Sequence, residues 1–364
     1  MNDPVKPPQL HTLLQEAAES IWTADFLLIA TGAGFSADSG LPTYADVARH
    51  PVYQRHGLEY GDLCRTTCLN KYPELFYGFW GSCFRDYQDH TPHTGYHILR
   101  HWCERKAQRQ EAAESSTALP CYYHYTSNVD GHLRKVGFPS ERIHEMHGCI
   151  DTWLALARKK DDVDGTTFQN HPLAWIELPS SFRFPIDKES LQCSLSEVHN
   201  RILAIVNDPQ LTKLDPTLIR FRPRVLMFDD GIEAHEFMRL KEASNHYQEW
   251  EEKMELQMAK GSQTLTVLEI GCGTRVPSVR QECQDVVPLD TARRCHADLS
   301  DDQDEPRCTH IRINPDDFEI EYVQKNHVPG VKTISLQGNA LEVLSEIDQR
   351  IKGLEETTGL HRKN

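Results

Sequence analysis

The stretch DFLLIATGAGFSADSGLP, residues 25–42, decides the fold. Its first half is a continuous apolar run, which is typical of a strand that is buried on both faces of a parallel sheet. Its second half is a glycine turn, in which Gly32 and Gly34 allow a ligand to approach the backbone closely. A strand followed by such a turn indicates a nucleotide-binding α/β unit, although a glycine turn can also be purely structural.

Strands and helices alternate along the rest of the chain. Further strands are predicted where short apolar runs recur, at residues 121–127, 143–146, 224–228, 264–270, 311–314 and 333–337. Helices are predicted where apolar residues recur at helical spacing, at residues 10–23, 96–109, 130–136, 233–258 and 340–351. Because strands alternate with helices, we predict an α/β fold with a doubly wound, Rossmann-like parallel sheet.

Two segments interrupt this alternation and predict insertions. Residues 46–91 are rich in aromatic residues and predict a helical module that covers the glycine turn. Residues 148–222 lack clear periodicity and predict a small inserted module, whereas the acidic stretch 285–309 predicts a solvated loop. The remaining chain is expected to form the sheet domain and a short tail, with the sheet domain at 1–45, 92–147 and 223–355 and the tail at 356–364.

Composition limits the classes of function. The chain has 364 residues, of which 39% are hydrophobic, and its formal net charge is −15. Such a surface repels phosphate backbones and no basic cluster offsets it, so nucleic-acid binding is not expected. No apolar run reaches the roughly 20 residues that span a bilayer, and the N-terminus lacks the features of a signal peptide. The 11 cysteines are irregularly spaced, which predicts free thiols in a cytoplasmic or nuclear protein.

Polar residues also follow two of the later predicted strands. TSNVDG places Ser127, Asn128 and Asp130 after one strand, and EMHGC places His147 after the next. The carboxyl ends of parallel strands form the ligand-binding edge of such sheets. A single histidine is more often structural than catalytic, so the functional interpretation depends on the order and spacing of the three motifs.

A second glycine turn occurs in VLEIGCGTR, residues 267–275. An apolar strand that ends in an acidic residue and Gly-x-Gly is also how many methyltransferases open their cofactor site. Here Arg275 stands where a third glycine is usual. Roughly 90 residues follow, too few for the strands and helices that a methyltransferase builds after this motif. A methyltransferase is therefore the weaker alternative.

Taken together, the motifs resemble those of the sirtuins. Sirtuins carry, in order, GAG-x-S-x-x-SG-[IL]-P, QN-x-D, HG, a strand ending in Phe-Gly, GTS and IN. This chain carries GAGFSADSGLP, SNVD, HG, VLMFDD, IGCGT and RIN in the same order, over about residues 27–344. The resemblance implies an NAD-dependent protein-lysine deacylase, which cleaves NAD to nicotinamide and transfers the acyl group to ADP-ribose.

The resemblance also implies a role for each matching residue. His147 would act as general base on a ribose hydroxyl, with Asn128 and Asp130 as catalytic residues that also contact NAD. Phe228 and Asp229 would bind the acylated peptide, which adds to the protein as a β-strand. Other residues would contact the phosphates, riboses and adenine of NAD: Gly32, Ala33, Gly34, Ser36, Ser39, Tyr44, Ser127, Gly271, Gly273, Thr274, Asn314 and Asn339.

Three positions depart from the sirtuin pattern. Ala45 stands where the family has an arginine, and alanine offers no donor to an anion. Ser127 replaces a glutamine. Asp229 replaces the glycine after Phe228, where a side chain would obstruct peptide docking.

The zinc ligands are the largest departure. Sirtuins with zinc carry two cysteine pairs between HG and the VLMF strand. This chain has only Cys149 and Cys193 there, so four thiolate ligands are not available and we predict no structural zinc. The small module is instead expected to have an aromatic core made of Trp153, Phe168, Trp175, Phe182 and Phe184.

These departures leave three functional hypotheses open. The leading one is an NAD-dependent deacylase that acts on an acylated protein lysine. The second is an NAD hydrolase or ADP-ribosyltransferase that uses the same pocket, which the change at Asp229 favours. The third is a catalytically weakened NAD-binding module, which the change at Ala45 favours.

Overall fold

The computed structural model describes residues 8–42, 50–112, 119–158, 168–206, 208–209, 211–215, 218–260, 262–286, 306–323 and 330–357. Its larger sheet has six parallel strands in the order β3-β2-β1-β7-β8-β9. The strands are β1 (Phe26–Thr31), β2 (Tyr122–Thr126), β3 (Ile143–Glu145), β7 (Leu265–Ile270), β8 (Cys308–Asn314) and β9 (Val331–Gln337). The prediction of a doubly wound parallel sheet is thereby confirmed.

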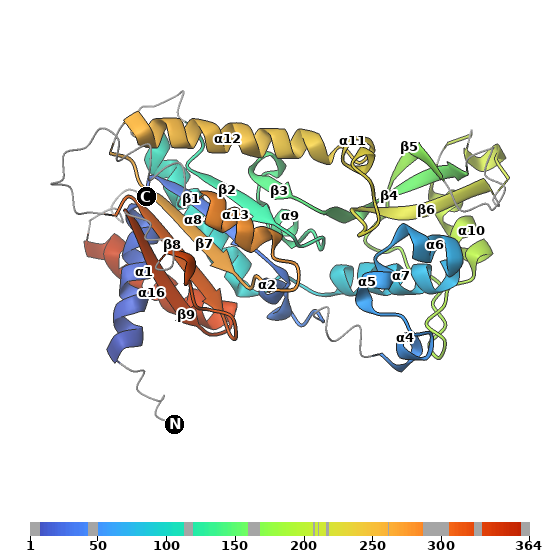
Figure 1. The fold of residues 1–364 in the computed structure, drawn as a ribbon, viewed down its shortest axis with the longest axis horizontal. Coiled ribbons are helices and arrows are strands. Elements are labelled where there is room, and N and C mark those ends of the chain that lie inside the picture. Colours follow the sequence, from blue (N-terminus) through green and yellow to red (C-terminus); the bar gives the residue numbers. More distant parts are fainter. Residues whose placement is uncertain are drawn as a thin grey trace.

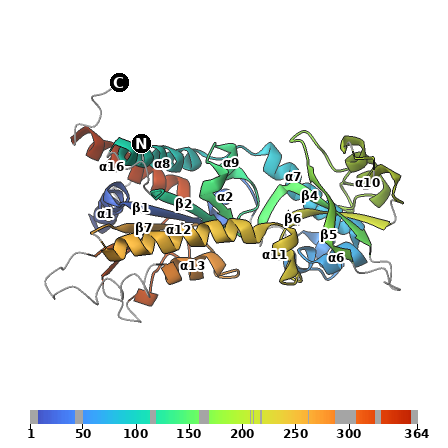
Figure 2. The ribbon, with the colours of Figure 1, turned by 90° about the horizontal axis from the view of Figure 1, so that it is seen from above.

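Helices cover both faces of this sheet (Figures 1 and 2). One face packs against α1 (Pro8–Thr23), α8 (Thr94–Ala112) and α16 (Ala340–Thr357). The other face packs against α12 (Leu240–Lys260) and α13 (Ser278–Val286). Because both faces are covered, all six residues of β1 are buried, as its continuous apolar sequence predicts.

The strand order reverses direction between β1 and β7. The chain runs outward from β1 through β2 to β3 on one side, and from β7 through β8 to β9 on the other. In open α/β sheets the crevice at such a switch point, beyond the carboxyl ends of the strands, is where ligands bind. The two glycine turns of the sequence follow β1 and β7, so they meet at this point.

The rest of the chain forms a second body at the other end of the molecule (Figure 1). A three-stranded antiparallel sheet, in the order β5-β4-β6, contains β4 (Gly148–Arg158), β5 (Phe168–Glu177) and β6 (Ile219–Val225). Residues of the helical module and of this small sheet share one hydrophobic core. The domain boundaries given above stay a prediction. The helices of this body are α4 (Pro51–Arg55), α5 (Tyr60–Leu63), α6 (Thr66–Lys71), α7 (Pro73–Asp89) and α10 (Leu195–Ile205).

The shorter helices lie between the elements already named. They are α2 (Ala33–Ala37), α9 (His132–Lys135), α11 (Glu233–Phe237) and two 3-10 helices, Ser140–Arg142 and Leu211–Lys213.

Three predictions about elements were wrong or incomplete. The strand expected at 224–228 lies at 219–225 and belongs to the small sheet, where it pairs with β4. The single helix expected at 233–258 is broken into α11 and α12, because Arg239 adopts a left-handed backbone with φ of 54°. Helix α13 was not predicted, and most of the expected acidic loop at 285–309 lies outside the described residues.

The aromatic core expected for the small module is present in part. Trp153, Phe182 and Phe184 are buried, and the rings of Trp153 and Phe184 lie 4.9 Å apart. Trp175 is partly buried, and the Phe168 side chain lies outside the described part of the chain. Among the described helices, none combines the length and apolarity that a bilayer crossing requires.

Candidate active site

The two glycine turns touch each other at the switch point. Gly32 N donates to Ile270 O at 3.0 Å, and Gly34 N donates to Gly271 O at 2.9 Å. A Cβ atom on Gly32 or Gly34 would lie 2.8 Å from Gly271 O. Gly271 has a φ of 63°, and a Cβ there would lie only 2.3 Å from the backbone nitrogen of Phe35.

Loop packing therefore already requires three of the predicted glycines. The approach of a pyrophosphate to Gly32 and Gly34 stays a prediction, and in the structure the small size of these glycines admits the neighbouring loop. Gly273 differs, because a Cβ there would meet no atom within 4 Å. The two loops form one rigid unit at the edge of the sheet.

A buried polar network lies beside this unit. Ser36 Oγ donates to Asp130 Oδ2 at 2.5 Å and accepts a hydrogen bond from Asn128 Nδ2 at 3.0 Å. Because the single Ser36 proton is used on Asp130, the Tyr96 hydroxyl, at 3.1 Å, donates to Ser36. Asp130 Oδ1 also accepts from the backbone nitrogen of His132 at 2.8 Å. The network fixes three of the predicted site residues, Ser36, Asn128 and Asp130, relative to one another.

His147 follows β3 at the same edge and is half-buried. Burial, helped by the nearby His235, lowers the pKa of His147 below its ordinary value of 6.5. The imidazole is therefore neutral at pH 7 and able to accept a proton. Its backbone carbonyl accepts a hydrogen bond from Leu226 N at 2.8 Å, which ties the histidine loop to the segment after β6.

A cavity of about 440 Å³ opens between the sheet edge and the helical module. One wall, which we call the catalytic wall, is made of predicted site residues. The opposite wall comes from residues 50–87, Leu191 and residues 225–228. The residues of the catalytic wall are Ala33, Ser36, Ser127, Asn128, Asp130 and His147.

Other predicted cofactor residues do not line this cavity. The Ser39 hydroxyl accepts from His93 N at 3.1 Å, and Gly273 and Thr274 are exposed, with Thr274 Oγ1 3.5 Å from Asp317 Oδ2. Asn339 is exposed just before α16. Tyr44 and Ala45 lie outside the described residues, so their predicted effects on NAD binding stay predictions.

Asn314 is engaged in holding the second glycine loop. Its Nδ2 donates to Cys272 O at 3.0 Å, and its Oδ1 accepts from the backbone nitrogens of Asp316 and Asp317, both at 3.1 Å. Arg280 donates to the same Cys272 carbonyl from Nε at 2.9 Å and from Nη2 at 2.8 Å. The contact of Asn314 with NAD stays a prediction, and in the structure its amide supports the loop.

Of the two predicted peptide-binding residues, Phe228 lines the cavity and Asp229 does not, and neither lies in a strand. Phe228 follows the end of β6, and its backbone nitrogen donates to Cys64 O at 3.0 Å. Asp229 accepts from the backbone nitrogens of Thr66, at 2.6 Å, and Thr67, at 2.9 Å, at the start of α6. The expectation that Phe228 lies in a strand was therefore wrong, and the Asp229 side chain faces α6.

These hydrogen bonds change the acidity of Asp229. Partial burial would raise the pKa of this carboxyl, but the hydrogen bonds from Thr67 and Thr66 outweigh it and lower the pKa. Asp229 is therefore charged at neutral pH and stabilises the first turn of α6.

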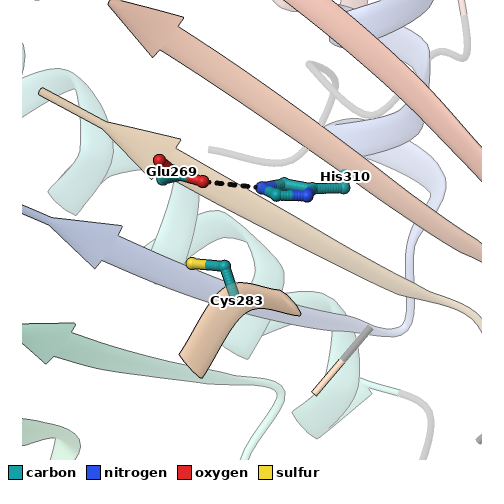
Figure 3. A group of neighbouring side chains, drawn as sticks. All are labelled: Glu269, Cys283 and His310. Atoms are coloured by element: carbon teal, nitrogen blue, oxygen red, sulfur yellow. Dashed lines mark hydrogen bonds and ion pairs between the residues drawn. The ribbon is translucent and has the colours of Figure 1, made fainter. Parts of the chain in front are cut away.

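One buried group of side chains has the residue types of a metal site. Glu269, Cys283 and His310 lie together between the large sheet and α13, with His310 Nε2 2.9 Å from Glu269 Oε2 (Figure 3). However, Arg312 Nε lies 2.9 Å and Arg280 Nε lies 3.6 Å from Glu269 Oε1. A cation would enter beside two permanent positive charges, so we interpret the group as a buried ion-pair network.

The same network explains how the second glycine loop is held. Burial alone would raise the pKa of Glu269, but His310, Arg312 and Arg280 lower it, so the carboxylate is charged. Glu269 thereby orients Arg280, which donates to the Cys272 carbonyl. No sequence motif indicated Arg280, because its role depends on contacts between α13 and the loop.

The residues of the catalytic wall fit the nicotinamide-ribose half of NAD. The cavity lies within the range of about 300–1,000 Å³ that encloses a small-molecule ligand, and its catalytic wall offers an amide, hydroxyls and an imidazole. The described lining offers little positive charge to the phosphates of NAD. Among the described lining residues Arg85 is the one permanent cation, and its Nη2 lies 2.8 Å from Asp86 Oδ1.

Sequence reasoning missed the partners of the predicted residues. Tyr96, which supports Ser36, sits on α8 and carried no motif. Tyr53 and Trp80, which form the opposite wall, belong to the aromatic segment that was expected only to cover the glycine turn. That enrichment in aromatic residues was the available signal.

The chain has similarity to known proteins over part of its length, although no family model matches it. The human mitochondrial NAD-dependent protein lipoamidase sirtuin-4 is 28% identical over 158 residues, which are 42% of this chain and 44% of that protein. The NAD-dependent protein deacylase 2 of Pseudomonas syringae is 31% identical over 134 residues, which are 36% of this chain and 49% of that protein. The matched segments thus span about half the length of these curated relatives.

A solved structure also aligns over nearly the whole chain. The crystal structure of a Sir2 homolog–NAD complex aligns with a TM-score of 0.49 and 14% identity, covering 93% of this chain and 94% of that chain.

Proposed function

We propose that the chain is a member of the sirtuin family and acts as an NAD-dependent protein-lysine deacylase. Its substrates would be NAD, an acylated lysine of a protein and one water molecule. Its products would be nicotinamide, the free lysine and an acylated ADP-ribose. The observation that carries the proposal is the catalytic wall, where three separate motifs bring Ser36, Asn128, Asp130 and His147 into one cavity.

NAD, when bound, would supply a reactive ribose carbon, to which the acyl oxygen bonds as the bond to nicotinamide breaks. The neutral His147 accepts the proton of a ribose hydroxyl, because burial keeps the pKa of the imidazole below 6.5. Asn128 orients the ribose or a water, and Asp130 holds Ser36 in place. The aromatic side chains of the opposite wall would shield the site from bulk water, which strengthens each of these polar contacts.

NAD hydrolysis or ADP-ribosyl transfer is a second candidate. One observation favours it: the backbone nitrogen of Phe228 already donates to Cys64 O, so this donor is not available to an added peptide strand. A pocket that binds NAD but binds peptide weakly would transfer the ADP-ribosyl group to water or to another acceptor.

We further propose that the small module holds no structural zinc. Cys149 accepts a hydrogen bond from Arg134 Nη2 at 2.5 Å, and burial raises the pKa of its thiol well above the ordinary value. Cys193 lies in the shared hydrophobic core of the second body. Neither thiol belongs to a metal-like cluster within the described ranges. The described cysteines are free thiols, which supports a cytoplasmic or nuclear location, and the acidic charge supports partners other than nucleic acid or membrane.

The test is nicotinamide release from NAD by the purified protein, with and without an acetylated or longer-acylated lysine peptide. We expect release that depends on the peptide and falls by at least about a hundredfold in His147→Ala, as removal of a general base does. Release that is independent of peptide would favour the hydrolase instead. The absence of release under both conditions would contradict an enzymatic function.

A further inference from the structure

The wall that faces the catalytic residues is aromatic and apolar. Tyr53, Tyr60, Phe79 and Trp80, which we call the aromatic wall, come from α4, α5 and α7. Their rings contact one another, with centroids 6.2 Å apart for Tyr53–Phe79, 6.0 Å for Tyr60–Phe79 and 5.2 Å for Phe79–Trp80. The aromatic wall extends the cavity away from the sheet edge into the second body.

Several other residues of the opposite wall are also apolar. Met227 is buried and lines the cavity after β6. The Cys64 and Cys83 thiols line it as well, and burial raises the pKa of Cys64 to about 12, so that thiol is uncharged at neutral pH. This half of the cavity therefore gains most from a ligand that buries apolar surface.

The charged side chains of the lining restrict the chemical class of the ligand further. Arg85 lines the cavity, but its Nε lies 2.9 Å and its Nη2 2.8 Å from Asp86 Oδ1, so its charge is already balanced. Asp86 and Asp130 are the acidic side chains of the lining, and Asp130 belongs to the catalytic wall. His50 accepts a hydrogen bond on Nδ1 from Val52 N at 3.3 Å. Among the described lining residues, then, no unpaired cation is available to a carboxylate, which is costly to bury alone.

The size of the cavity exceeds what the smallest acyl group needs. An acetyl group adds only a carbonyl and one methyl group beyond the lysine nitrogen. The cavity of about 440 Å³ has a catalytic wall for the reacting groups and, opposite it, an aromatic wall that an acetyl group would leave largely unfilled. Apolar cavity surface that meets no ligand atom loses its dispersion contacts.

We propose that the acyl group taken by this site is an uncharged aliphatic chain longer than acetyl, held against the aromatic wall. The inference rests on the proposed deacylase function and names the substrate class of that same site. Each further methylene group buried against the aromatic wall adds about fourfold to affinity. Acyl groups that end in a carboxylate are disfavoured, because no unpaired cation in the described wall receives them.

The experiment uses one peptide that carries acetyl, pentanoyl, octanoyl or glutaryl on the same lysine. Pentanoyl and glutaryl have the same number of carbons and differ in the terminal carboxylate, so they isolate charge from length. We expect kcat/KM from nicotinamide release to be at least about tenfold higher for octanoyl than for acetyl. We expect at least about tenfold preference for pentanoyl over glutaryl. Acetyl turnover equal to octanoyl, or glutaryl equal to pentanoyl, would overturn the inference and leave the deacylase proposal intact.

Direct binding separates this inference from the proposed activity. The dissociation constants of the same four peptides are measured with His147→Ala protein, in which turnover is removed. If no peptide supports nicotinamide release, the deacylase proposal fails, and affinity that rises from acetyl to octanoyl still supports the apolar site. Equal affinity for all four peptides overturns the site as well.

A pair of variants tests where the acyl chain lies in the cavity. Cys83→Phe places a ring in the space beside the aromatic wall and should lower the octanoyl-to-acetyl ratio of kcat/KM by at least about tenfold. Leu256→Phe adds the same ring on an exposed part of α12 and should leave that ratio unchanged. If both variants keep the wild-type ratio, the acyl chain does not lie against the aromatic wall. The peptide series on the unmodified protein decides the question even where Cys83→Phe fails to fold.

Discussion

At the residue scale, the glycines of the two loops have unequal roles although the sequence presents them alike. Gly271 combines a left-handed backbone with close contact to Phe35, whereas Gly273, two positions later, has open space around it. The sequence predicted all of them as cofactor-binding residues. It could not distinguish them, because the distinction depends on the approach of two loops that are far apart in the chain.

Gly271→Ala and Gly273→Ala therefore form a matched pair. We expect Gly271→Ala to lower the free energy of unfolding by about 2 kcal/mol or more, since the new Cβ meets backbone and the conformation disfavours L residues. Gly273→Ala should change it by less than about 0.5 kcal/mol. Urea denaturation of both variants measures the difference. Equal losses would show that the loop contact does not have the geometry described here.

Arg280 and Asn314 illustrate a second limit at this scale. Both donate to the Cys272 carbonyl, and Glu269 holds Arg280 from the neighbouring strand. Asn314 was predicted from the resemblance, with a role in contacting NAD, whereas Arg280 was not predicted. A carbonyl that receives donors from two elements leaves no signature in either local sequence.

At the element scale, the strands of the large sheet were predictable because each is a short apolar run with clear ends. The strands of the small sheet were not. β4 is covered on both faces, by Trp153 and its neighbours in one core and by Leu154 and Leu156 in another, so its sequence does not alternate. β5 contains Pro172, which coincides with an irregular register against β4. Proline inside a run argues against a strand, which is why this strand was missed.

Strand β2 carries a buried histidine that makes stability depend on pH. Both ring nitrogens of His124 lack a hydrogen-bond partner among the described residues, and burial lowers its pKa to about 3. Between pH 6.5 and 3 the unfolded chain therefore binds one more proton here than the folded chain. This contribution reduces stability as pH falls through that window, by up to about 1.4 kcal/mol per pH unit.

His124→Phe removes that proton site and retains the ring that packs on Phe138, at 4.1 Å between centroids. We expect the variant to gain stability relative to wild type as pH is lowered from 7 to 5. Chemical denaturation at three pH values measures the difference in the free energy of unfolding. A difference that stays constant with pH would contradict a neutral, buried His124.

The segment after β6 holds two neighbouring carboxylates in different environments. Asp230 binds the buried Arg222 through Nη1 at 2.8 Å and Nη2 at 2.7 Å, whereas Asp229 caps α6. Asp230→Ala leaves a buried guanidinium unpaired and should cost about 3–5 kcal/mol of unfolding free energy. Asp229→Ala removes a cap and should cost about 1 kcal/mol. A larger loss for Asp229→Ala than for Asp230→Ala, in the same denaturation assay, would reverse this assignment.

At the scale of the whole molecule, the site lies where two bodies meet. The catalytic wall comes from the carboxyl ends of β1, β2 and β3, and the aromatic wall comes from the helical module. Sequence motifs predicted the first wall, because short polar motifs follow recognisable strands. They could not predict the second wall, because it is assembled from helices that carry no motif and from a loop whose place depends on β6.

The central claim is that this cavity joins the cleavage of NAD to the removal of an acyl group from lysine. Identification of the products by mass spectrometry, after incubation with NAD and an octanoyl-lysine peptide, tests it most directly. The account predicts octanoyl-ADP-ribose, deacylated peptide and nicotinamide in equal amounts, and none of them with His147→Ala. Unmodified ADP-ribose with intact peptide would contradict the account and identify the protein as an NAD hydrolase.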